Sequence, residues 1–162
     1  MDVKTGTEYR WPGVRMDFAS GECDLSQFGR VVVAVSVNIY SREPSRDLPP
    51  EAGDKPMIVG EFHFGALDRG LFHTGLVATR DQKERAACYC AFVNACLDHP
   101  RFVGAHWFQW RDQPLTGRFD GENYQIGFVT VTDAPYPELV EAARKTASGM
   151  YQRRSHHAIS KH

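Results

Sequence analysis

Three stretches of the chain are dense in apolar, β-branched residues. They are residues 30–40 (RVVVAVSVNIY), residues 56–64 (PMIVGEFHF) and residues 102–110 (FVGAHWFQW). Long runs with apolar residues on both alternating faces are typical of parallel strands that other layers cover on both sides. The pattern therefore predicts three buried strands, and residues 13–19 (GVRMDFA) form a weaker fourth candidate.

Helical periodicity appears twice. Between residues 81 and 98 the apolar positions recur at steps of three and four, which predicts a helix with one buried stripe. The stripe consists of Ala86, Cys90, Val93 and Leu97. Residues 79–82 (TRDQ) fit a capping box at the start of this helix. A second helix is predicted for residues 137–152, because proline suits the first helical position.

Strands that alternate with helices indicate an α/β fold with a parallel sheet. The segments between them are polar or rich in glycine and proline, so they are predicted to be loops: residues 41–55, 65–78 and 111–125. Residues 126–131 should be short and extended. In sheets of this kind the chemistry lies at the carboxyl ends of the strands.

Polar and aromatic side chains gather at those three strand ends. The first strand ends with Asn38 and Tyr40 on one face, and the second ends with Glu61 and His63 on one face. The third ends in aromatic residues, among them Trp107 and Trp110. A tyrosine hydroxyl, an amide, a carboxylate and indoles at one edge are suited to binding and cleaving a sugar.

Glu61 is the best candidate for a nucleophile in this group. A carboxylate within a buried strand is costly unless it is paired or hydrogen-bonded. At a strand end it could attack an anomeric carbon while a tyrosine or asparagine donor holds it in place. The structural alternatives are an ion pair of Glu61 with an arginine, a purely orienting role for His63, and a core position for Trp107.

Composition sets the outer limits of these interpretations. The 162 residues suffice for one domain with a core, whereas a complete eight-stranded α/β barrel usually needs ~250 residues. A net charge of -1 gives no electrostatic attraction to nucleic acid. The longest aliphatic run, residues 31–35, is far shorter than the ~20 residues of a membrane-spanning helix. We divide the chain into an irregular segment (1–30), one domain (31–152) and a disordered tail (153–162).

The cysteines form no CxxC pair, which argues against a structural zinc site and a disulfide framework. We expect reduced, partly buried thiols at Cys23, Cys88, Cys90 and Cys96. No metal and no cofactor are expected.

Three segments resemble glycoside hydrolases. Residues 55–76 (KPMIVGEFHFGALDRGLFHTGL) resemble the strand-seven region of β-agarases of glycoside hydrolase family fifty. Residues 105–136 (AHWFQWRDQPLTGRFDGENYQIGFVTVTDAPY) are similar to the strand-eight region and its loop, and residues 35–40 (VSVNIY) to strand six. The Gln-Trp-Arg run at residues 109–111 also resembles β-galactosidases of family forty-two.

The resemblance implies a retaining (β/α)8-barrel hydrolase with two catalytic glutamates, acting on a galactan-type oligosaccharide or polysaccharide. The chain would form the C-terminal portion of the barrel, about strands five or six to eight, with incomplete closure. Glu61 matches the nucleophile, and Trp110 matches a tryptophan at the end of strand eight. The loop at residues 112–124 would line the cleft. The expected substrate-binding residues are Asn38, Tyr40, His63, Trp107, Trp110, Arg111, Asp112 and Gln113.

One departure from the family concerns the acid/base glutamate, which follows an asparagine at the end of strand four. No Asn-Glu pair occurs in this sequence. We therefore expect that the missing N-terminal half of the barrel, or a second copy of the chain, completes the fold. The chain alone should cleave agarose negligibly unless another acid replaces the missing one: Glu8, Glu22 or Glu122.

Two other functions remain open at this point. The first is a metal-dependent barrel hydrolase that uses Glu61, His63 and His106, although metal barrels more often present His-x-His at a strand end. The second is a catalytically inactive remnant that binds carbohydrate.

Overall fold

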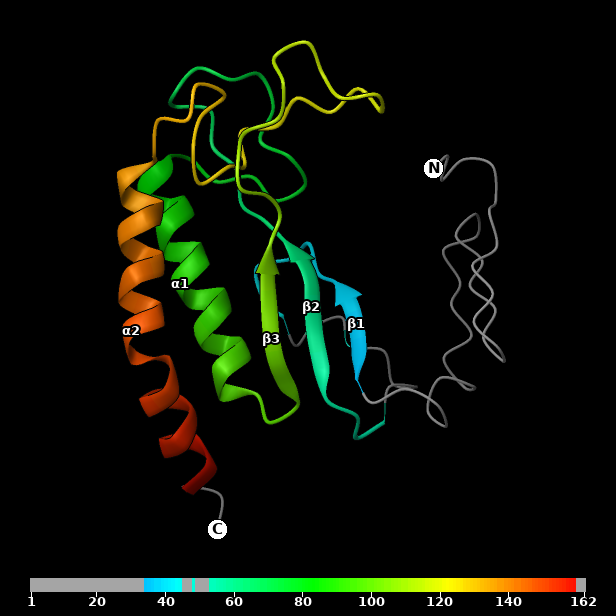
Figure 1. Cartoon of the computed structure of the whole chain (residues 1–162), viewed down its shortest axis with the longest axis vertical. Helices are drawn as coiled ribbons and strands as arrows, with labels where there is room; N and C mark the ends of the chain where they lie inside the picture. The colour runs from blue at the N-terminus through cyan, green and yellow to red at the C-terminus, as the bar shows by residue number, and fades with distance from the viewer. Residues whose placement is uncertain (1–33, 45–47, 49–52, 160–162) are drawn as a thin grey trace, which may run out of the picture.

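The computed structural model describes residues 34–44, 48 and 53–159. They form, in chain order, β1 (Val35–Asn38), β2 (Met57–Phe62), α1 (Gln82–Asp98), β3 (Phe102–Trp107) and α2 (Pro137–Ile159). The strands are parallel and lie in the order β1-β2-β3. Their carboxyl ends point to one edge, where the long loops gather (Figure 1). We call this edge the rim. The predicted α/β fold with a parallel sheet is confirmed, as an open three-stranded sheet.

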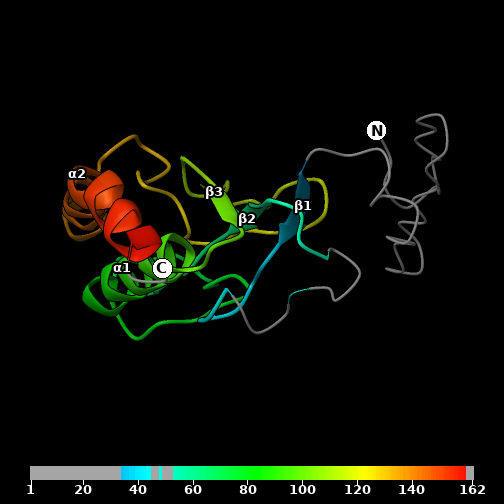
Figure 2. The same ribbon diagram turned by 90° about the horizontal axis from the view of Figure 1, so that it is seen from below.

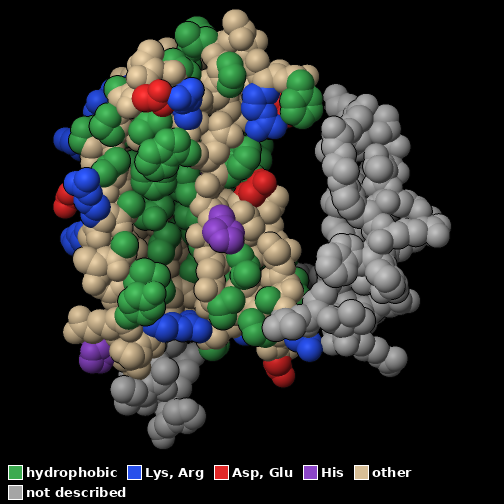
Figure 3. Space-filling view, in the orientation of Figure 1, with side chains coloured by type: hydrophobic (Ala, Val, Ile, Leu, Met, Phe, Trp, Pro, Cys, Tyr) green, Lys and Arg blue, Asp and Glu red, His purple; other side chains and the backbone are tan. Residues whose placement is uncertain are grey.

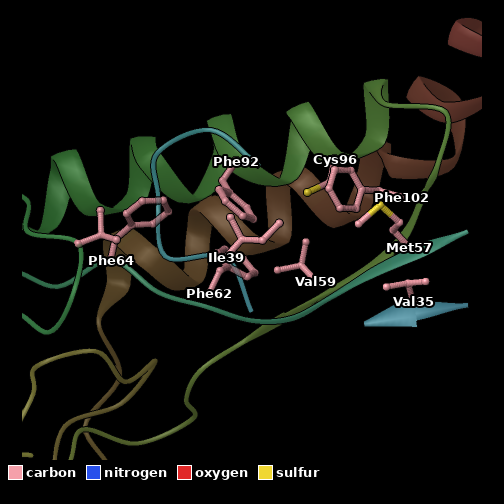
Figure 4. Packing of buried hydrophobic residues seen from close by; sticks show 10 residues of the cluster. Val35, Ile39, Met57, Val59, Phe62, Phe64, Phe92, Cys96 and Phe102 are labelled. Carbon is pink, nitrogen blue, oxygen red and sulfur yellow. The ribbon is translucent and has the colours of Figure 1, made fainter. Parts of the chain in front are cut away.

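The core lies between the sheet and α1. Met57, Val59 and Phe62 of β2 are at most 1% exposed and pack with Phe92 and Cys96 of α1 (Figure 4). The rings of Phe62 and Phe92 stack with their centroids 4.3 Å apart. Both helices lie on the same side of the strands (Figure 2).

A bulge interrupts the alternation of β2. Val37 pairs with Val59, but the next residue of β1, Asn38, pairs with Glu61, so Gly60 is an extra residue in β2. A bulge changes the face to which the following side chains point. As a result Phe62, and not Glu61, joins Val59 in the core. The bulge thus frees the Glu61 carboxylate from the core face.

Helix α1 begins at a different cap from the one predicted. The N-cap is Asp81, whose side chain accepts a hydrogen bond from the backbone N–H of Glu84 at 2.8 Å. The hydroxyl of Thr79 instead donates to the carbonyl of Gly65 at 2.9 Å. The most buried residues of the helix include two polar ones, Gln82 and Arg85.

The predicted stripe of α1 is only half-buried, and part of it lies toward α2. Cys90 shows the contact: its sulfur accepts a hydrogen bond from the hydroxyl of Thr146 on α2 at 3.3 Å. The thiols of Cys88, Cys90 and Cys96 are free, as expected.

Helix α2 continues to Ile159, so the prediction of a disordered tail is wrong for residues 153–159. The extension is anchored on the end of α1, because Arg153 donates to Asp98 at 2.7 Å and Arg154 donates to the carbonyl of Leu97 at 2.9 Å.

Residues 126–131 form isolated bridges at Val129 and no strand. The possible strand at residues 13–19, and Cys23, lie outside the described residues. Among the described residues, neither α1 nor α2 combines the length and the apolar character that a membrane-spanning helix needs.

Candidate active site at the rim

Tyr40 and Glu61 meet at the rim. The phenol of Tyr40 donates a hydrogen bond of 2.5 Å to Oε2 of Glu61. Burial, and then the hydrogen bond to Glu61, raise the pKa of the Tyr40 hydroxyl far above its ordinary value, so Tyr40 remains a neutral donor. The expected hydrogen bond between these two side chains is confirmed in the structure.

His63 lies beneath this pair and not on the surface. Its side chain is 2% exposed, and its Nε2 accepts a hydrogen bond from the backbone N–H of Leu76 at 2.9 Å. The imidazole is 4.8 Å from the Tyr40 ring, between centroids. Burial, helped by the positive charge of Arg85, lowers the pKa of His63 to about 4, so the ring is neutral at pH 7. The prediction of a substrate contact does not fit this burial; His63 supports Tyr40 instead.

Asp112 and Gln113 are also buried, at 3% and 0% exposure. The Asp112 carboxylate accepts hydrogen bonds from the N–H of Gly127 at 2.7 Å and from the hydroxyl of Tyr136 at 2.6 Å. Gln113 accepts from the N–H of Tyr124 at 2.8 Å. Both side chains were expected to bind substrate, but their hydrogen-bonding groups hold the loop together.

The two tryptophans at the end of β3 differ in environment. Trp107 packs edge-on against Phe62 with centroids 5.2 Å apart, and its indole N–H donates to the carbonyl of Ile126 at 2.8 Å, so this half-buried ring is packed against the core. Trp110 is 69% exposed and stacks on Phe128. Of the two, only Trp110 offers a free aromatic face at the rim.

Asn38 and Arg111 are exposed near the same edge. The side chain of Asn38 lies over Gly60, where an added Cβ would come within 2.7 Å of its Oδ1. The lack of a side chain at Gly60 therefore makes room for Asn38 beside Glu61. Arg111 forms an ion pair of 2.6 Å with Asp133, which is 60% exposed.

The metal-site hypothesis gains no support from this geometry. Nowhere in the described chain do three His, Cys, Asp or Glu side chains lie where they could share a metal ion. His63 is committed to the N–H of Leu76, and His106 is exposed on β3. Glu61, His63 and His106 do not converge.

The sequence interpretation placed the loop at residues 112–124 along the cleft and named Glu122 as a possible acid, but it did not single out Arg118 or Phe119 at the tip of this loop. Arg118, Phe119 and Glu122 lie there, with Gln113 donating to Glu122 at 2.7 Å. The charges of Arg118 and Glu122 act on the hydroxyl of Tyr40, so this tip lies close to the site. The glycines of the string TGRFDGEN were the available signal for a tight turn.

Known agarases are similar to this chain in sequence and in structure. β-Agarase B from Vibrio sp. (strain JT0107) is 56% identical over 102 residues, which are 62% of this chain and 11% of that protein. β-Agarase A from the same strain is 55% identical over 102 residues, 62% of this chain and 10% of that protein. The crystal structure of an agarase aligns with 80% of this chain at a TM-score of 0.74 and 45% sequence identity. The aligned part is 19% of the agarase chain.

No family model matches the chain. The chain is nonetheless β-agarase-like: it is related to glycoside hydrolases over most of its length. It spans only about a tenth of the length of the curated relatives.

Proposed function

We propose that this chain supplies the nucleophile of a retaining glycoside hydrolase site that acts on agarose or a related galactan, with Glu61 as the nucleophile. The observation that carries the proposal is the Tyr40–Glu61 hydrogen bond at the rim of a β-agarase-like fold. Tyr40 fixes Oε2 of the carboxylate, which leaves Oε1 to attack the anomeric carbon.

The bond changes are those of a double displacement. Glu61 forms an ester bond to the anomeric carbon as the glycosidic oxygen leaves and takes a proton from a second carboxylic acid. Water then cleaves the ester from the same face as the departed group, with the second residue acting as base. The two carboxyl groups must stand ~5–5.5 Å apart for this reaction.

We propose that the three strands correspond to the last strands of a (β/α)8 barrel, and that another part of that barrel supplies the acid/base residue. The parallel order β1-β2-β3, with helices on one side and loops at the carboxyl ends, supports this assignment. Within the chain, Trp110, Asn38 and Arg111 are the proposed sugar contacts, because they are exposed at the rim.

A leaving group that needs no protonation isolates the role of Glu61. An activated 2-deoxy-2-fluoro-β-galactoside with a dinitrophenolate leaving group requires only the nucleophile for the first step. Incubation of the chain with this reagent should give a fluorogalactosyl ester on Glu61, located by peptide mass spectrometry. Glu61→Gln should abolish the adduct.

The result can also contradict the proposal. An adduct on another residue, or no adduct on the folded wild-type chain, would exclude Glu61 as a working nucleophile. Binding of agarose oligosaccharides without adduct formation would then favour a chain that binds carbohydrate but does not cleave it.

A further inference from the structure

We infer that Phe119 is a stacking platform for a sugar ring of the same polysaccharide, in a subsite separate from the bond that is cleaved. This inference rests on the proposed function and adds a binding position to it. The platform stands at the tip of the loop between β3 and α2.

The exposure of Phe119 is the first observation. Its side chain is 90% exposed, more than any other large apolar side chain of the described residues, including Trp110 at 69%. The free energy falls when a partner covers an aromatic ring that is exposed to water. A ring held at a loop tip beside a polar rim is therefore suited to a ligand with an apolar face.

The loop holds this ring in a fixed turn. The N–H of Arg118 donates to the carbonyl of Glu122, and the N–H of Gly121 donates to the carbonyl of Arg118, both at 2.9 Å. Gly117 and Gly121 have φ angles of +85° and +88°, which other residues rarely adopt. A pre-ordered turn loses little conformational entropy when it binds a ligand.

Arg118 is the charged neighbour of the ring. Its guanidinium carbon lies 5.7 Å from the centroid of Phe119 and 5.6 Å from the centroid of Phe108, within the range of cation–π contacts. The guanidinium also pairs with Asp120 at 2.6 Å and with Glu122 at 3.6 Å. The ring is thus flanked by groups that can hydrogen-bond to hydroxyls, while most of its surface stays free.

The position of the tip indicates which ligand Phe119 would bind. The loop reaches from the end of β3 across to the side of β1, above the strand ends (Figures 1 and 2). In Figure 3 a hydrophobic and a basic side chain lie together at the upper right, over this tip. A polysaccharide bound at Glu61 continues beyond the cleaved bond, so one of its further rings can reach the tip. A sugar ring, with an apolar face and hydroxyls at its edge, matches an aromatic ring surrounded by ionic groups.

Calorimetric titration tests the inference with an agarose-derived hexasaccharide as the probe. The wild-type chain should bind it, and Phe119→Ala should weaken the affinity about tenfold, which corresponds to the loss of one aromatic stacking contact. Phe119→Trp should keep the affinity, because it retains a flat face. Tyr151→Ala, which removes an 82% exposed aromatic ring from α2, should bind like the wild type.

The inference fails if Phe119→Ala binds the hexasaccharide as well as the wild type does, if Phe119→Trp is as weak as Phe119→Ala, or if the wild type does not bind at all. Labelling of Glu61 by the small fluorogalactoside separates this failure from failure of the proposed function. Because the proposed platform binds a different sugar ring from the one that Glu61 attacks, Phe119→Ala should be labelled at the wild-type rate. Labelling without any effect of Phe119 overturns the platform alone, whereas hexasaccharide binding that depends on Phe119 without labelling overturns the nucleophile alone.

Discussion

The phenol of Tyr40 and the carboxylate of Glu61 come from the ends of neighbouring parallel chain segments and are joined by a hydrogen bond of 2.5 Å. The contact depends on the extra residue Gly60, which turns Glu61 out of the core face of β2. It also depends on His63, whose buried ring packs against Tyr40. The carboxylate is therefore aimed by backbone geometry and by one hydroxyl.

Tyr40→Phe should slow the labelling of Glu61 by the activated fluorogalactoside about tenfold to a hundredfold, because a hydrogen bond to a charged group contributes about 1.5–3 kcal/mol to its placement. The rate is measured by intact-protein mass spectrometry over time. Tyr151→Phe, which removes an exposed hydroxyl from α2, is the control. Equal rates for Tyr40→Phe and the wild type would show that the hydroxyl does not position the nucleophile.

The buried histidine should make stability depend on pH. The pKa of His63 is lowered from 6.5 to about 4 in the folded chain, so below pH 6.5 the unfolded chain takes up a proton that the folded chain refuses. Above about pH 6.5 the neutral ring contributes fully to the free energy of unfolding. As the pH falls from 6.5 toward 4, the free energy of unfolding decreases by about 3 kcal/mol in total.

His63→Gln should remove this part of the pH dependence. We expect urea unfolding at pH 7.5, 5.5 and 4.5 to show a smaller fall in the free energy of unfolding for the variant than for the wild type. His106→Gln, a change at an exposed histidine of β3, is the matched control. A variant of His63 with an unaltered slope would mean that its ring is protonated as readily in the folded state as in the unfolded state.

Substitution by alanine should have opposite effects on the stability of the fold at two glycines. A Cβ at Gly127 would lie 2.2 Å from the backbone nitrogen of Asp112, and the Gly127 carbonyl also accepts a hydrogen bond from the buried Arg85 at 2.6 Å. Backbone atoms cannot move aside cheaply, so Gly127→Ala should cost about 3 kcal/mol or more. Gly149, within α2, has no atom within 4 Å of an added Cβ, and Gly149→Ala should stabilise by about 0.5–1 kcal/mol.

Thermal and urea unfolding of the two glycine variants provide the measurement. The comparison is internal, because both changes add one methyl group to the same chain. A Gly127→Ala variant with wild-type stability would contradict the close packing of this loop against the end of β3.

The strands could be predicted because their sequences are nearly continuous apolar runs. The position of α1 could be predicted from its helical spacing, although its buried face includes Gln82 and Arg85, which the apolar pattern did not mark. The rim position of Glu61 and Tyr40 followed from the direction of parallel strands. Strict alternation alone, however, places Glu61 on the same face as Val59, and only the bulge at Gly60 separates them. Such a register shift depends on the paired strand, so the local sequence does not reveal it.

The roles of the buried polar residues were harder to predict. His63, Asp112 and Gln113 resemble site residues in the sequence because they are polar and follow strands. Their partners are backbone and side-chain groups of other segments, such as the N–H of Leu76 for His63 and the hydroxyl of Tyr136 for Asp112. Hydropathy does not distinguish a polar side chain that is buried inside the fold from one that faces a ligand.

The final prediction concerns assembly. Among the described residues, no strand pairs with the outer edge of β1 or of β3. A groove of about 400 Å3 lies between β3 and the two helices, and it is lined mainly by apolar residues. Figure 3 shows this hydrophobic band along the helices. An incomplete barrel is expected to expose the inner faces of its strands, with residues such as Val33, Val59 and Val103 or their neighbours. Val103 is 60% exposed, but Val59 is 0% exposed in the core, so the expectation is wrong for Val59. Val33 lies outside the described residues.

Unpaired strand edges and apolar grooves promote association, so the purified chain should be oligomeric or poorly soluble. A twofold dimer is the simplest closed arrangement. Light scattering at micromolar concentration should give a mass above that of one chain, and Val103→Lys should lower it, because a charge on an edge strand opposes pairing. Thr132→Lys, at an exposed loop position, should leave the mass unchanged. A soluble monomer that unfolds cooperatively would contradict the open-edge interpretation, since residues of the same chain would then have to cover β1 and β3.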